Sequence, residues 1–139
     1  MMERDLVFRD RLVSLVEQLR SDSDIQKVYR RVARATYQMV KEAGARDWED
    51  LKERADGQTY DSMLQLFDHH KQRAAARDDL PMQRAMDVLA LSLVARRQDQ
   101  PDLKPGIDYL DKIIATCFEG RSERMKNVMH VRARTAAKP

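Results

Sequence analysis

Apolar residues recur along most of this chain at steps of three and four. Because an α-helix turns by about 100° per residue, such steps place apolar side chains on one helical face. No stretch shows the strict alternation typical of a half-buried strand. The pattern therefore predicts an all-α fold of five to seven helices, at about residues 3–20, 24–43, 47–55, 58–77, 81–97 and 107–119.

The segment 81–97 is the most hydrophobic of these helices. Its apolar seam repeats at steps of four, three and four, and its C-terminal half is apolar nearly all round. The seam comprises Met82, Met86, Leu89 and Leu93. A helix that is apolar on all sides is normally surrounded by other helices. We therefore expect a compact multi-helix bundle built around residues 81–97.

The helix expected at residues 3–20 carries a narrow seam like that of a coiled coil. This seam consists of Phe8, Leu12, Leu15 and Leu19. Such a stripe pairs as readily with a second copy as with the rest of its own chain. A homodimer through this seam is therefore an alternative to packing within the bundle.

Several residues are typical of helix ends. Ser23 with Gln26 fits a capping box, Gly44 is placed to end a helix, and Asp47 can cap a short one. Gly120 is expected to close the last core helix. The chain then divides into a helical domain at residues 1–120 and a basic segment at 121–139, expected as a short amphipathic helix or partly disordered.

A basic stripe follows one face of the helix expected at 24–43, opposite its apolar face. The residues proposed to bind are Lys27, Arg30, Arg31, Arg34 and Lys41. This stripe could dock an acidic helix or follow phosphates. The alternative is a solvated face with partners inside the chain, such as the acid-rich residues 47–56.

Charge is distributed unevenly along the chain. Residues 121–139 carry a net charge of +5, whereas the whole chain carries +3, so residues 1–120 carry −2. A second candidate binding site therefore lies in this segment, at Arg121, Arg124, Lys126, Arg132 and Arg134. Its basic residues alternate with methionines and valines, a composition that suits nucleic acid, an anionic membrane or a protein groove.

No combination of residues indicates catalysis. The single cysteine, Cys117, excludes an intrachain disulfide and suits a reducing compartment. Metal-ligand spacings and Gly-rich phosphate loops are missing, so we expect no cofactor, no metal, no small-molecule substrate and no enzymatic activity. The apolar runs are too short for a transmembrane helix, so we expect a cytoplasmic protein.

One short segment resembles a known pattern. Residues 70–74 are similar to the His-x-x-Lys-Gly/Ser sequence of histidine phosphotransfer domains, with Arg73 in place of Lys and Ala74 in place of Gly/Ser. The resemblance implies a phosphorelay carrier that uses His70. The apolar periodicity instead predicts His70 at the edge of the core.

Three hypotheses about function follow. The leading one is a non-enzymatic protein-interaction or regulatory module that uses the basic helix face, the C-terminal segment or both. The alternative is a small nucleic-acid-binding protein that contacts phosphates through Arg30, Arg31, Arg34 and the basic tail. The phosphorelay carrier is the third.

Overall fold

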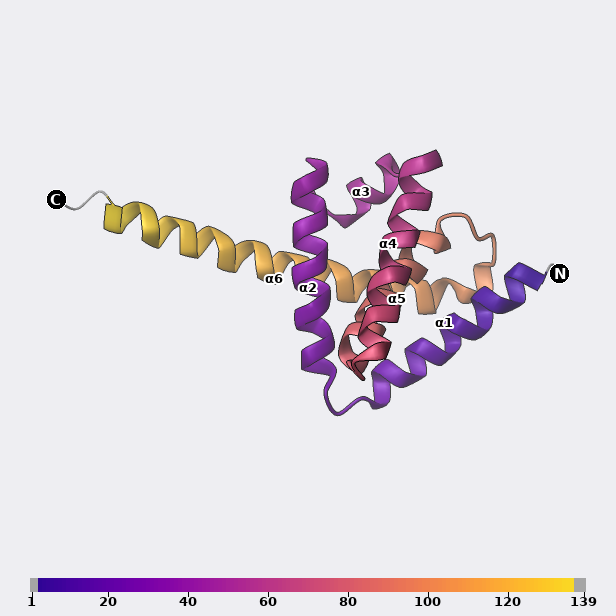
Figure 1. Cartoon of the computed structure of the whole chain (residues 1–139). Helices are drawn as coiled ribbons and strands as arrows, with labels where there is room; N and C mark the ends of the chain where they lie inside the picture. The colour runs from indigo at the N-terminus through magenta and orange to yellow at the C-terminus, as the bar shows by residue number, and fades with distance from the viewer. Residues whose placement is uncertain (1–2, 137–139) are drawn as a thin grey trace.

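The computed structural model describes the backbone of residues 3–136 and the side chains of residues 6–128. Within these ranges the chain is all-α and has no strand, which confirms the predicted fold class. Its elements are α1 (Glu3–Ser21), α2 (Ile25–Ala43), α3 (Trp48–Arg54), α4 (Gly57–Ala76), α5 (Leu80–Ala95), the 3₁₀ turn η1 (Pro101–Leu103) and α6 (Lys104–Ala136), shown in Figure 1.

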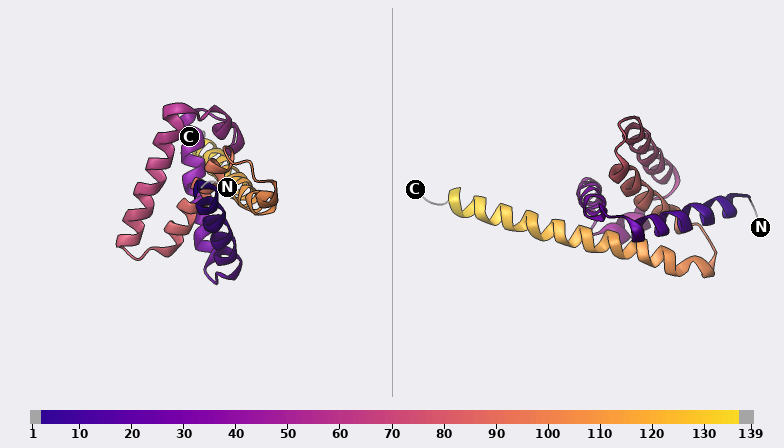
Figure 2. Two further views of the ribbon diagram at one scale, coloured as in Figure 1. Left: turned by 90° about the vertical axis from the view of Figure 1, so that its right-hand side faces the viewer. Right: turned by 90° about the horizontal axis from the view of Figure 1, so that it is seen from below.

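Helix α5 lies at the centre of the bundle, as its hydrophobicity predicts. It packs against α4, α2, α6 and α1 (Figure 2). Val88, Leu89 and Leu93 on this helix are inaccessible to solvent. Burying side chains of this size stabilises the fold by about 1.5–3 kcal/mol each, so α5 supplies much of the apolar contact that holds the other helices.

Of the four expected helix ends, those at Gly44 and Asp47 are confirmed, and those at Ser23 and Gly120 are wrong. Gly44 adopts φ 67°, the left-handed conformation that ends α2, and the Asp47 carboxylate accepts a hydrogen bond from the Asp50 amide at the start of α3. The capping box at Ser23 does not form, because Asp24 directly precedes α2. The Asp24 amide instead donates to the Asp22 carboxylate at 2.8 Å.

The helix α6 does not stop at Gly120, which corrects the expected boundary there. The whole helix, from Lys104 to Ala136, has 33 residues and is about 50 Å long at 1.5 Å per residue. A glycine ends a helix when it adopts a positive φ, and among the described glycines only Gly44 and Gly57 do so. Residues 121–136 therefore extend α6, which projects past α2 and away from the bundle (Figures 1 and 2).

The seam of α1 packs inside its own chain. Phe8, Leu12, Leu15 and Leu19 are 4%, 1%, 3% and 2% exposed. Helix α1 lies against α5 and α6, which cover this seam. The hypothesis of a homodimer through this seam is therefore wrong, because its apolar surface is already covered. No helix among the described residues is both long and apolar enough to cross a membrane.

Candidate binding surface and a buried polar cluster

The basic residues of α2 lie together on its outer face. Lys27, Arg30, Arg31 and Arg34 line a surface hollow of about 310 Å³. The opposite side of the helix is buried through Val28, Val32, Ala33, Thr36 and Val40. The helical period thus separates a packed face from a cationic one, as the sequence predicts. We call residues 27–34 on this side the basic face.

The acid-rich segment 47–56 does not neutralise the basic face. Its Asp50 carboxylate lies 3.1 Å from the Arg54 guanidinium and 3.7 Å from that of Arg46. Glu49 pairs with Lys52 at 2.9 Å. The intramolecular partners suggested for the stripe in this segment are therefore wrong, because no carboxylate of residues 47–56 pairs with a cation of the basic face among the described residues.

Two cations of the basic face have no ionic partner among residues 6–128. Lys27 and Arg31 each lie 3.7 Å from a carboxylate, of Asp24 and Asp79 respectively. Arg30 and Arg34 form no ion pair or hydrogen bond with any described residue and are exposed. These two guanidinium groups are consequently the ones available to an outside anion.

The remaining candidate cations lie elsewhere. The Lys41 ammonium is 5.4 Å from the centroid of the Tyr37 ring, within the range of a cation–π contact. Arg124 and Lys126 are exposed on the projecting part of α6, and Arg121 is half-buried. The side chains of Arg132 and Arg134 lie outside the described residues.

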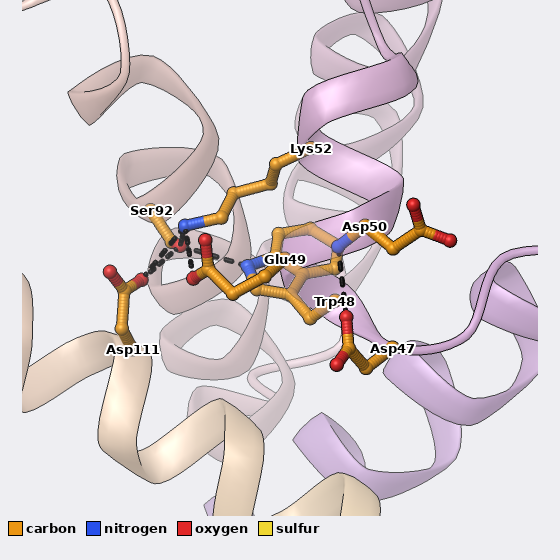
Figure 3. A network of polar contacts seen from close by, with 7 residues as sticks. All are labelled: Asp47, Trp48, Glu49, Asp50, Lys52, Ser92 and Asp111. Atoms are coloured by element: carbon orange, nitrogen blue, oxygen red, sulfur yellow. Dashed lines mark hydrogen bonds and ion pairs between the residues drawn. The ribbon is translucent and has the colours of Figure 1, made fainter.

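A buried polar cluster joins three helices (Figure 3). Lys52 of α3 is only 3% exposed. Its ammonium lies 2.9 Å from Glu49 Oε1 and 3.2 Å from Asp111 Oδ1 on α6. It also donates to Ser92 Oγ on α5 at 3.2 Å. A buried ammonium ion requires such partners, because burial without them is costly.

Ser92 is the centre of this cluster. Its hydroxyl oxygen accepts a hydrogen bond from Trp48 Nε1 at 2.9 Å and donates to Asp111 Oδ1 at 2.5 Å. Trp48 itself lies in the core, since it is 3% exposed. The sequence interpretation missed the cluster, although a serine within the apolar run of α5 was a signal for it.

The cluster has a structural role. A serine beside a lysine also occurs in nucleophilic enzymes, where the neutral amine removes the hydroxyl proton. Here the Lys52 nitrogen contacts two carboxylates, of Glu49 and Asp111, as well as the Ser92 hydroxyl. Ser92 is also 0% exposed, so a substrate cannot reach it. The contacts instead fix α3 and α6 against α5.

The other candidate groups are separate from this cluster. Burial raises the pKa of the half-buried Cys117 thiol to about 11, which suppresses its reactive thiolate. His70 is exposed, so its expected place at the core edge is wrong. The helical period places His70 on the same side of α4 as the buried Met63, Phe67 and Ala74, so its exposure results from how the other helices pack against α4 and not from the period. In the part of the chain that the structure describes, no group of three or more potential ligands could hold a metal ion.

Comparisons with protein-family models, curated proteins and solved structures found no match to this chain. The interpretation of the basic face therefore rests on its geometry and charge.

Proposed function

We propose that this protein is a non-enzymatic helical interaction module that binds an acidic protein partner through the basic face of α2. The observation that carries the proposal is the pair Arg30 and Arg34. These exposed residues lie one turn apart and have no carboxylate partner among the described side chains. Arginine binds carboxylates in a planar, bidentate geometry, which makes such a pair suited to an acidic helix.

Three arginines elsewhere in the bundle already have carboxylate partners, whereas Arg30 and Arg34 have none among the described residues. Arg9, Arg11 and Arg84 each pair with an aspartate elsewhere in the bundle. The spacing of Arg30 and Arg34 matches carboxylates four residues apart on a partner helix, because residues at that spacing share a helical face. An amphipathic acidic helix lying along α2 would therefore meet both guanidinium groups at once.

The ends of the basic face favour a short acidic motif over a continuous polyanion. Residues 27–34 span about 10 Å along the helix axis. Beyond them stand two exposed carboxylates, Asp24 near Lys27 and Glu42, which is hydrogen-bonded to Gln38. A phosphate backbone that continued in both directions would approach these like charges, whereas a partner with one or two acidic turns would not.

Nucleic-acid binding is the second candidate function. It is favoured by the hollow on α2, whose lining consists of four cationic residues. Phosphate groups bind such clusters, and the binding weakens as salt replaces the released counterions. Salt also screens contacts between arginines and carboxylates, so the relative affinity for the two ligands, together with the steepness of the salt dependence, separates the two candidates.

Fluorescence anisotropy with two labelled probes tests the proposal. One probe is a helical peptide with glutamates four residues apart, and the other is a short DNA duplex. The variant Arg30→Glu/Arg34→Glu should weaken peptide binding by about tenfold or more, since each charged hydrogen bond contributes about 1.5–3 kcal/mol. The control Arg73→Glu/Lys112→Glu changes the net charge equally at exposed positions without described partners and should bind as wild type.

Three results would reject the protein-partner proposal. Equal loss in the test and control variants would mean that net charge alone attracts the peptide. Tighter binding of the duplex, with log K falling by about 0.9 per phosphate contact against log salt, would favour nucleic acid instead. Absence of binding to both probes would reject both functions.

A further inference from the structure

A groove runs between α1 and α4, with α5 as its floor. A hollow of about 180 Å³ lies against α4 and α5, and a second of about 270 Å³ lies against α1 and α5. Both hollows are lined by Arg11, Lys71, Asp87 and Leu91, so they form one continuous depression, which we call the α1–α4 groove. Within it, Asp87 of α5 pairs with Arg11 of α1 at 3.2 Å and with Lys71 of α4 at 2.9 Å.

The end of α6 has little contact with its own bundle. Most side chains of residues 119–128 are exposed, including Val128 at 43%, and Met125 is half-buried. The helical residues 122–136 form a segment of a length that is only marginally helical in water without tertiary contacts. Contact with another apolar surface would stabilise this segment.

We propose that the end of α6 of one copy of this chain docks in the α1–α4 groove of a second copy. The segment cannot reach the groove of its own chain. Helix α6 is continuous, and its end lies on the far side of α2 from α1 and α4 (Figure 1 and right view of Figure 2). A reciprocal exchange between two copies forms a closed, two-fold symmetric dimer.

The projecting segment is long enough to span the groove. Residues 122–136 extend about 21 Å, and the stretch of α1 that lines the groove, residues 10–18, extends about 12 Å. Positions 7, 11, 14 and 18 share one helical face, which brings Val7, 52% exposed, onto the strip that borders the groove. Met125 and Val128 of the second copy would cover this apolar surface.

Charge also favours this docking. Residues 121–139 carry +5, whereas residues 1–120 carry −2. Asp10 on the α1 wall has no ion pair within the described part of the chain, and Asp68 stands on the α4 wall. The cations of the projecting segment would therefore meet carboxylates on both sides of the groove. This proposal uses residues separate from the basic face of α2 and is independent of the function proposed above.

Disulfide trapping between two single-cysteine variants of the full chain tests the docking. In a Cys117→Ser background, one variant carries Val128→Cys and the other Ser14→Cys, in the groove. Mild oxidation of the mixture should link the two variants to each other. Ser62→Cys is the matched control, because Ser62 is exposed on α4 and does not line the groove. Analytical ultracentrifugation of the wild type should give about twice the chain mass of 16.2 kDa.

Four results would overturn the proposal. A wild-type chain that sediments as a monomer would show that the exchange does not occur. A dimer without the mixed disulfide would place its interface elsewhere. Val128→Cys chains linked only to each other would indicate that two α6 ends pair directly. Equal linkage to the Ser62→Cys control would indicate random collision.

Discussion

Replacement of Ser92 by alanine should destabilise the protein more than its small change in volume implies. The Ser92 hydroxyl accepts hydrogen bonds from Trp48 and Lys52 and donates one to Asp111. All three bonds disappear together in Ser92→Ala. Because serine and alanine are similar in size, little of the effect comes from a cavity.

The size of the loss in stability depends on which of the three partners can form replacement hydrogen bonds. Trp48 is 3% exposed, so its indole N–H would lose its acceptor without gaining water, which costs about 1–3 kcal/mol. Lys52 keeps Glu49 and Asp111, and the Asp111 side chain is 27% exposed and can bind water. We therefore expect a loss of about 2–3 kcal/mol in the free energy of unfolding, or about 10 °C in Tm for a domain of this size.

Urea unfolding, followed by circular dichroism and by fluorescence of the single tryptophan, measures this loss. The matched control is Ser62→Ala, which removes an exposed hydroxyl and should change stability by less than about 0.5 kcal/mol. If Ser92→Ala were as stable as Ser62→Ala, with the same dependence on urea, the inferred contribution of the cluster would be refuted.

Two further predictions concern acid stability and the length of α6. The Asp24 amide, followed by the Arg84 guanidinium, lowers the pKa of Asp22 below 3.8. The ionised carboxylate therefore stabilises the fold above its unfolded pKa, and this contribution is lost as pH falls through the lower folded pKa. Between about pH 4 and pH 2, unfolding measurements should show a shallower decline for Asp22→Asn than for wild type, and equal slopes would contradict the assignment. Separately, Gly120→Ala should increase helicity and stability by about 0.5–1 kcal/mol, because Gly120 lies inside a helix with no atom within 4 Å of an added Cβ. Reduced helicity by circular dichroism would instead indicate that this glycine ends the helix.

Local patterns in the sequence were enough to predict the helices and much of their orientation. The apolar period placed Leu12, Leu89 and Leu93 in the core, and the structure buries all three. Gly44 and Asp47 marked helix ends correctly, because their effect depends on backbone conformation within a few residues. The same helical period also predicted that the basic residues of α2 share the side opposite its apolar residues.

Only the tertiary structure decided which of these surfaces are covered and which charges are paired. Lys52 is in contact with residues 40 and 59 positions further along the chain, which no helical period relates to it. The packing of α1 against α5 and α6 likewise covered the seam that, by its sequence, could equally have paired with a second copy. A helical period specifies which side chains share a face. What that face meets depends on how distant helices pack, because buried polar groups and charges are stabilised only by the partners that this packing brings within reach.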